Sequence, residues 1–334
     1  MEMKTIRNLL LATSAAAGAL PVGLLPAAPA RAGEFLTQTA ESHQVKADPD
    51  NSAESSEHTP NYYKAWRKSR EASLRNPAGY LSLTGLFWLT EGRHSIGSAP
   101  GNDFVLPYGR GPKLAGYIEW KGDRLVFHAA EGSDVRIDDK PVTEAILQSD
   151  AGGRVATRVQ IGELTFWVVD RFGRLGIRLS DPASPVLQAY KGTASYPYDA
   201  SYRVEGRYVP AGEPESVDVP NHLGSTTKER VVGKVVFEWE GSTYELTGAD
   251  TSGDDLFIVF GDKTNGKQTY GAGRFLKVPI PETGESTVVD FNLAHNPACA
   301  YNKHTTCPFP PARNRLPFPV PAGETMQGLD ELPE

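Results

Sequence analysis

The chain has 334 residues, of which 39% are hydrophobic, and its formal net charge is −7 at pH 7. This length and apolar content predict a globular protein of about two domains, and the acidic balance argues against nucleic acid and anionic membranes, since both are bound by clustered Lys and Arg. The 33 glycines and 26 prolines favour short strands and tight turns over long helices, so a mainly β fold is expected.

Residues 1–32 have the pattern of an export sequence. Lys4 and Arg7 precede an apolar run, and small residues at 30–32 suit a cleavage site. The run is interrupted by glycine and proline and is short for a membrane span. We therefore predict a signal peptide, a mature chain that begins at Gly33 without a membrane span, and a periplasmic or secreted location.

A polar tail and one helix are expected next. Residues 33–58 contain few large apolar side chains, which predicts disorder. Thr59 can cap a helix whose first position is Pro60, so a helix is predicted over 59–76. Its basic run at 67–70 is interpreted as a solvated face. The side of the helix that docks on the following domain is expected to carry Tyr63, Trp66 and Arg70.

From about residue 80 onward, short segments alternate between apolar and polar residues and are separated by turn-forming residues. This spacing is typical of antiparallel sheets packed as sandwiches or barrels. We expect two such β domains, over 77–182 and 183–334. The clearest strand segments are 125–129, 164–169, 175–179, 234–239 and 243–248.

The segment GRHSIGSAPGNDFVLP at residues 92–107 joins an Ile-Gly pair to an Asn-Asp pair followed by aliphatic residues. It resembles the opening of a forkhead-associated (FHA) domain, which implies a β-sandwich for the first β domain. In that family the residue after Ile-Gly is commonly an arginine that binds phosphothreonine, but in this chain it is Ser98. A serine hydroxyl cannot reproduce a bidentate guanidinium, so no phosphopeptide binding is expected.

Motifs of the second β domain, together with one at the start of the first, resemble a known family more closely. They are LSLTGLFWL at 81–89, Asp-x-Thr-x-Gly and Thr-Tyr-x-x-Gly-Arg within 257–276, and the Asp-Phe-Asn to Gly-Glu segment within 288–324. They are similar to those of the family catalogued as domain of unknown function 1684, and the resemblance covers roughly residues 60–324. It implies exported, β-rich proteins without an established activity.

Polar residues lie among strong strand formers in the same region, and two interpretations are open. One is a buried network of Arg274 with carboxylates that fixes strand ends and the long C-terminal loop. The other is a site for a polar ligand. The candidate catalytic residues are Asp262, Tyr270, Arg274 and Asp290, and the candidate ligand-binding residues are Asn292, Asn296, Asn314 and Glu324.

These residues lead to two function hypotheses. The first is a module of the cell envelope that binds a small ligand or carbohydrate through Arg274, Tyr270 and the asparagines. The second is a hydrolase or lyase in which Asp262 or Asp290 is the acid or base and Tyr270 and Arg274 position an oxyanion. The chain contains no nucleophile elbow, dinucleotide fingerprint, phosphate-binding loop or haem motif, so no cofactor is expected.

Cys299 and Cys307 are the two cysteines of the chain. With His295 and His304 their spacing is compatible with zinc. However, two cysteines in an exported protein more often form a disulfide, and nearby prolines disfavour helical spacing. We therefore predict a disulfide that closes a loop of nine residues, no metal site, and asparagines that satisfy backbone groups without a strand partner.

Overall fold

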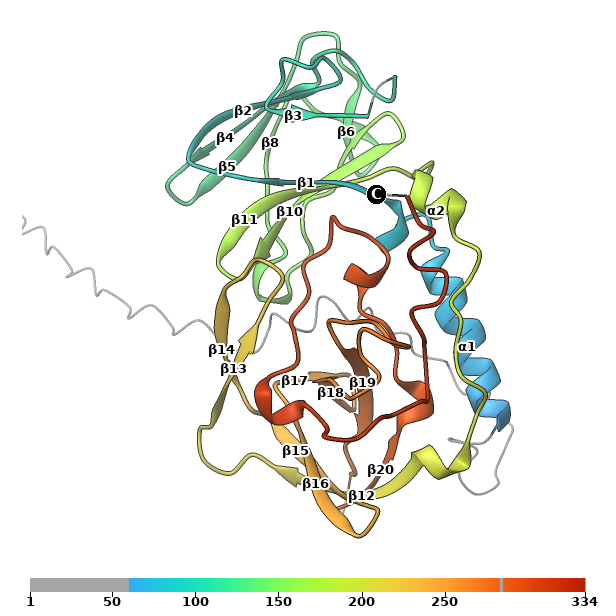
Figure 1. The fold of residues 1–334 in the computed structure, drawn as a ribbon. Coiled ribbons are helices and arrows are strands. Elements are labelled where there is room, and N and C mark those ends of the chain that lie inside the picture. Colours follow the sequence, from blue (N-terminus) through green and yellow to red (C-terminus); the bar gives the residue numbers. More distant parts are fainter. Residues whose placement is uncertain (1–59, 108, 283–284, 334) are drawn as a thin grey trace, which may run out of the picture. The chain divides into compact units, whose positions relative to one another are not determined.

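The fold is mainly β with one N-terminal helix, as predicted, in a computed structural model that describes residues 60–107, 109–282 and 285–333 (Figure 1). Nearly all neighbouring strands run antiparallel, and β2 and β3 form a parallel pair. The predicted signal peptide and tail lie outside the described residues. None of the described helices is long and apolar enough to cross a membrane.

The helix α1 spans Pro60–Leu74, so it begins at the proline that the sequence indicates. Tyr63 and Leu74 are buried on its inner side, and the Tyr63 hydroxyl donates a hydrogen bond to the Tyr196 carbonyl at 2.9 Å. Trp66 packs against the core of the second β region. The predicted inner face is therefore confirmed for Tyr63 and Trp66, but the expectation that it docks on the following domain, residues 77–182, was wrong, because both side chains belong to the core of the second β region.

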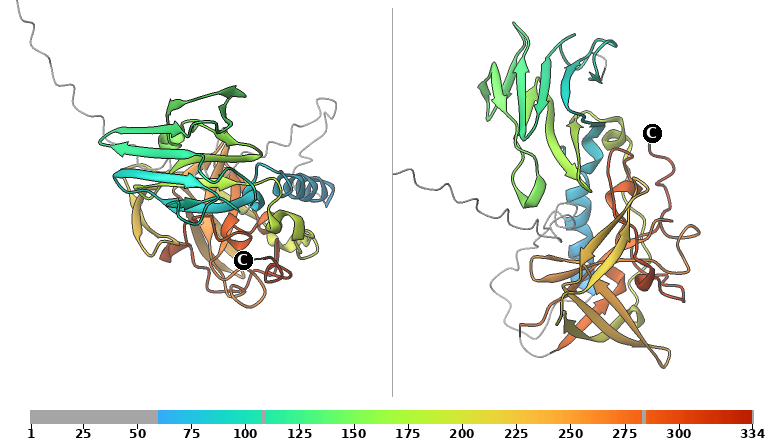
Figure 2. Two further views of the ribbon diagram at one scale, coloured as in Figure 1. Left: turned by 90° about the horizontal axis from the view of Figure 1, so that it is seen from above. Right: turned by 90° about the vertical axis from the view of Figure 1, so that its left-hand side faces the viewer.

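Residues 83–180 form a two-sheet sandwich (Figure 2). Side chains of both sheets, such as Phe127, Phe166 and Ile177, fill one apolar core because alternate residues of each strand point inward. One sheet has the order β1 (Leu83–Trp88), β11 (Arg174–Ser180), β10 (Leu164–Arg171), β9 (Val159–Ile161), β6 (Val135–Ile137) and β7 (Lys140–Pro141). The other has the order β3 (Phe104–Val105), β2 (Gly92–Gly97), β4 (Gly116–Lys121), β5 (Arg124–Ala129) and β8 (Glu144–Ile146).

A short helix, α2 (Pro185–Ala189), leads into the second β region, whose core contains Val235, Ile258 and Val289. Its sheets are open. One sheet has the order β16 (Ser242–Gly248), β15 (Gly233–Trp239), β12 (Arg203–Pro210) and β20 (Ser286–Asp290). A second sheet contains β17 (Asp250–Ser252), β18 (Asp255–Phe260) and β19 (Arg274–Pro279), and β13 (Ser216–Pro220) and β14 (Thr226–Arg230) form a hairpin.

The C-terminal segment after β20, red in Figure 1, has no extended strands and contains three short 3₁₀ turns, η4 (Phe291–Leu293), η5 (Ala298–Ala300) and η6 (Ala312–Asn314). Asparagine side chains fix it to the sheets. Asn314 bonds to the amide and carbonyl of Thr247 and to the Val259 carbonyl, and Asn302 donates to the Leu83 carbonyl. The prediction that asparagines satisfy backbone groups without strand partners is confirmed at these positions.

Candidate ligand-binding cavity

Arg274 and Asp262 form a fully buried ion pair. An Arg274 Nη2–Asp262 Oδ2 distance of 2.8 Å joins them, and both side chains have 0% exposure. Arg274 also donates to the carbonyls of Val320 and Ala322, and Asp262 accepts from the Val320 and Thr264 amides. Burial lowers the pKa of Arg274, and the carboxylate of Asp262 opposes that shift. The pair fixes the C-terminal segment to the start of β19.

The other two candidate catalytic residues have different partners. Asp290 is buried and accepts hydrogen bonds from the backbone amide and the side-chain amide of Asn292, so it caps η4. The Tyr270 hydroxyl donates to the Cys299 carbonyl at 3.1 Å, and burial raises the pKa of Tyr270. Neither Asp262 nor Asp290 is exposed enough to meet a substrate in this conformation.

The four candidate ligand-binding residues divide into two groups. Asn292 and Asn314 are bound to backbone groups, Asn292 by exchanging two hydrogen bonds with Asp199. By contrast, Asn296 and Glu324 lie together, because the Asn296 amide donates to Glu324 Oε2 at 2.7 Å. The Oδ1 atom of Asn296 is buried without a hydrogen-bond partner.

The predicted disulfide is not formed, because Cys299 and Cys307 are free thiols. They are nevertheless in contact, since the Cys299 amide donates to Cys307 Sγ at 3.2 Å. His295 packs against the rings of Trp66 and Phe275. Within the part of the chain that the structure describes, no group of three His, Cys, Asp or Glu residues is placed to hold a metal ion.

A cavity of about 570 Å³ lies between α1 and residues 191–195. Of the predicted site residues, Glu324 lines it. The basic run at 67–70 contributes three of the lining residues. Lys68 is exposed, as the interpretation of the run as a solvated face expects, whereas the Arg70 side chain is only 13% exposed. The cavity is lined by Lys64, Arg67, Lys68, Arg70, Glu71, Lys191, Gly192, Thr193, Ala194, Ser195 and Glu324.

Helical spacing brings the α1 residues to the cavity. Four lining residues follow the i, i+3, i+4, i+7 pattern and therefore share one side of the helix: Lys64, Arg67, Lys68 and Glu71. Arg67 Nη2 donates to the Thr193 carbonyl at 3.0 Å, which connects that side to the opposite wall. The same spacing is visible in the sequence, but nothing in the sequence indicates which segment lies across from it.

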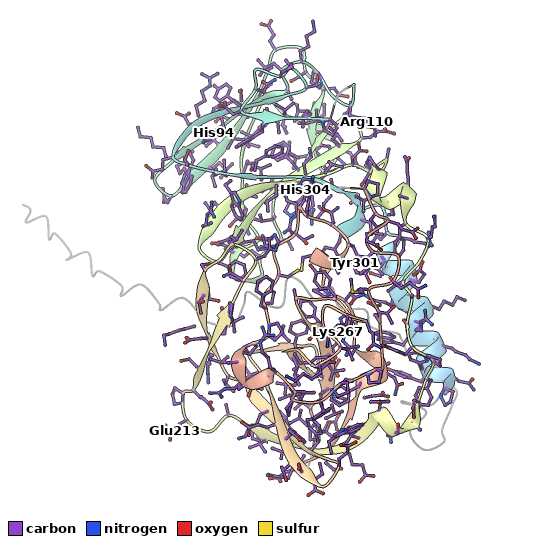
Figure 3. The ribbon with its side chains drawn as sticks, in the orientation of Figure 1. His94, Arg110, Glu213, Lys267, Tyr301 and His304 are labelled. Carbon is purple, nitrogen blue, oxygen red and sulfur yellow. The ribbon has the colours of Figure 1, made fainter. Side chains whose placement is uncertain are left out.

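Arg70 and Glu324 form the floor of the cavity. Arg70 Nε lies 3.1 Å from Glu324 Oε1, and the two side chains are 13% and 3% exposed. Arg70 Nη2 also donates to the Asn296 carbonyl at 2.9 Å. Burial lowers the pKa of Arg70, but the Glu324 carboxylate and Tyr301 raise it by more. Tyr301 and His304, labelled in Figure 3, both belong to the C-terminal segment.

A chain of hydroxyl groups connects the two carboxylates of the lining. It runs from Glu71 through Tyr190, Thr193 and Tyr301 to Glu324, with successive oxygen–oxygen distances of 2.8, 2.7, 3.1 and 2.9 Å. Three hydroxyl protons serve four contacts, so with both carboxylates ionised one contact has no proton. The contact between Thr193 and Tyr301 is the longest of the four, so we assign the missing proton to it. Both carboxylates therefore have internal hydrogen-bond donors.

The lining of the cavity has an excess of positive charge after its ion pairs are taken into account. Its lining has five basic and two acidic residues; Glu324 is paired with Arg70 and Glu71 with Arg75. Among the described residues, Lys64 and Lys68 have no ion-pair partner, while Lys191 is 85% exposed beside Glu331. A concave surface with an excess of one charge concentrates counter-ions, so this cavity is suited to an anion.

Comparison with known proteins gives a family and several similar structures. The chain belongs to the family described as protein of unknown function (DUF1684), whose profile matches residues 188–325. A solution NMR structure of an uncharacterized protein from Haloarcula marismortui is 32% identical, with a TM-score of 0.35; the match covers 41% of this chain and 78% of that one. No curated protein matches the sequence.

Two structures of FHA domains are also similar to parts of this chain. One, from work on phosphothreonine-dependent FHA interactions, is 19% identical with a TM-score of 0.20 and covers 27% of this chain and 78% of its own. The other is 18% identical with a TM-score of 0.20 and covers 28% and 76%. Here the Ser98 hydroxyl contacts the Gly111 and Pro112 carbonyls.

Proposed function

We propose that the protein is an exported binding module that holds a small, polar, anionic molecule in the cavity between α1 and residues 191–195. The observation that carries this proposal is the positive lining in a chain whose net charge is −7. The volume of about 570 Å³ is within the range of small-molecule sites. Export is supported by the sequence pattern of residues 1–32.

The lining supplies two kinds of contact. Lys64, Lys68 and Lys191 bring flexible ammonium groups, which attract an anion without fixing its orientation. Thr193 and Ser195 bring hydroxyl groups on a wall that Arg67 and the hydroxyl chain hold in place. A wall ordered before binding reduces the entropy lost when the ligand binds.

The kind of ligand follows from what the lining contains. Among the described residues around the cavity, none is aromatic, so a neutral sugar has no ring on which to stack. A sugar acid or a sugar phosphate can instead be held by its charge and its hydroxyl groups. The hydrolase or lyase alternative is not adopted, because Asp262 and Asp290 are buried and already hydrogen-bonded.

Thermal-shift titrations with glucuronate, glucose 6-phosphate, citrate and neutral glucose test this proposal. At least one anion should stabilise the wild type, glucose should not, and the Lys64→Ala/Lys68→Ala variant should bind that anion several-fold more weakly. Lys113→Ala/Lys121→Ala is the matched control, since both lysines are exposed on the first β region. Absence of any anion effect, or equal binding by the α1 variant, would refute the proposal.

A further inference from the structure

Cys299 and Cys307 form a thiol pair within the C-terminal segment. Cys307 is 1% exposed, whereas Cys299 is partly exposed. The Cys299 amide donates to Cys307 Sγ at 3.2 Å, and η5 and the prolines at 297 and 308 restrict the backbone on either side. Cys299 is therefore the more exposed residue of the pair, and Cys307 is the more buried one.

Arg178, on β11, is a buried cation whose charge acts on Cys307. Its residue is 6% exposed, its Nε is buried without a hydrogen-bond partner, and no carboxylate among the described residues forms an ion pair with it. Burial, and then the charge of Arg171, lower the pKa of Arg178 to about 10. A buried guanidinium without a partner is costly, so an anion beside it would be stabilised.

Of the groups whose charges act on Arg178, Cys307 can supply that anion. Asp150 is already paired with Arg171 at 2.8 Å, and the remaining one, Tyr80, is a phenol. Although burial raises the pKa of Cys307, hydrogen bonds from Cys299 and Thr305 and the charge of Arg178 lower it overall. The hydrogen bond to Cys307, together with burial, raises the pKa of Cys299. The shared proton therefore belongs to Cys299.

We propose that Cys299 and Cys307 are a reversible dithiol–disulfide centre that exchanges electrons with an external disulfide. Cys299 is the entry sulfur because it is the more exposed residue of the two, and Cys307 is the resolving sulfur because it is buried in contact with Cys299. This role differs from that of a permanent structural disulfide, and it does not depend on the ligand cavity.

The exchange has two steps. In the first, Cys299 loses its proton and its sulfur attacks an external disulfide RS–SR′, forming a mixed disulfide with RS and releasing R′S⁻, which takes up that proton. In the second, the Cys307 thiolate attacks Cys299 Sγ and releases RS⁻, which is protonated by solvent. The two cysteines lose two electrons in total, and the external disulfide gains them as two thiols.

Arg178 influences the equilibrium as well as the second step. Stabilising a thiolate stabilises the reduced pair, so the disulfide becomes a stronger oxidant than an unperturbed one. Closing the disulfide also leaves Arg178 without its anionic neighbour, which acts in the same direction. The pair should therefore exchange with glutathione instead of remaining oxidised against it.

Equilibration of the folded protein in buffers of reduced and oxidised glutathione tests the proposal without any mutation. Mass spectrometry after alkylation should show a mixture of dithiol and intramolecular disulfide that shifts with the glutathione ratio. A fully oxidised protein at every ratio would indicate a structural disulfide, and a fully reduced one would indicate inert thiols. Either result would overturn the proposal.

Single variants test which cysteine is the entry sulfur and which is the resolving sulfur. With oxidised glutathione, Cys307→Ser should keep a stable glutathione adduct on Cys299, while Cys299→Ser should react little because Cys307 is buried. In Arg178→Gln the adduct should resolve roughly three- to tenfold more slowly, whereas the exposed control Arg124→Gln should match the wild type. Faster reaction of Cys299→Ser than of Cys307→Ser would contradict the assignment.

Discussion

Arg274 contacts three acceptors, one in the loop before β19 and two in the C-terminal segment. It binds the Asp262 carboxylate and the carbonyls of Val320 and Ala322, so one guanidinium connects β19, the loop before it and the C-terminal segment. The residue was singled out in the sequence because a cation between buried strand residues needs a partner. Of the two candidate aspartates, Asp262 and Asp290, Asp262 is its ion-pair partner.

Replacing Arg274 should therefore destabilise the fold. Arg274→Ala leaves Asp262 buried without its cation, and we expect a loss of about 3–5 kcal/mol in the free energy of unfolding. Arg274→Lys should also be destabilising, because one ammonium group cannot serve all three acceptors. Urea denaturation measures both. Arg207→Ala, which removes an exposed pair with Glu285, should cost about 0–1 kcal/mol; an equal effect of Arg274→Ala would contradict the structural role.

His304 makes the stability dependent on pH. Burial, with the positive charges of Lys303 and Arg178, lowers the pKa of His304. The unfolded chain consequently binds this proton at a higher pH than the folded chain does, so stability falls as the pH drops below about 6.5 towards the folded pKa. The His304→Asn variant should lose less free energy of unfolding between about pH 8 and pH 5. Identical losses in variant and wild type would exclude this contribution.

The side chain of Asn314 takes the place of a strand partner for backbone groups of two strands. It lies in η6 and satisfies one amide and two carbonyls of β16 and β18, which are not neighbours in any sheet. Asn314→Ala leaves three buried backbone groups without partners, so we expect a loss of roughly 3 kcal/mol or more. Thermal or urea denaturation measures it against Asn61→Ala, at an exposed position of α1. Comparable stability of the two variants would contradict the role.

The elements differ in how well the sequence indicates them. The start and inner face of α1 were predictable because Pro60 marks its beginning and Tyr63 and Trp66 recur at helical spacing. The wall opposite its outer side was not predictable, because it is formed by residues 191–195, more than a hundred positions away. Local patterns indicate an element and its faces, but they do not indicate which distant segment covers a face.

The same limit applies to the predicted site. Asp262 with Arg274, and Asn296 with Glu324, proved to be neighbours because buried polar groups must find partners. Asp290 and Tyr270 were grouped with them by sequence distance alone, yet they bind Asn292 and the Cys299 carbonyl. Among the predicted residues, Glu324 lies both in a buried network and at a cavity wall.

The whole molecule carries its charge unevenly. The chain is acidic overall, whereas the cavity has an excess of basic residues. Such a distribution limits nonspecific association with polyanions and still attracts a small anion locally. Binding should therefore weaken as the ionic strength rises, since the exposed lysines are screened.

Export concerns the whole chain and has a direct test. Expression in a bacterial host, followed by N-terminal sequencing of the periplasmic fraction, should give a mature protein that begins at or near Gly33. The reason is the combination of a basic start, an apolar run and small residues at 30–32. An intact Met1 on protein recovered from the membrane or the cytoplasm would contradict export.

An NMR titration of the ¹⁵N-labelled protein with glucuronate, or with whichever anion stabilises it most, tests the ligand site most directly. The amide signals of Gly192, Thr193 and Ala194 should shift with the anion concentration in the wild type and in Lys113→Ala/Lys121→Ala. In Lys64→Ala/Lys68→Ala the same shifts should need several-fold more anion. Shifts confined to residues outside the cavity, or equal shifts in all three proteins, would contradict the account.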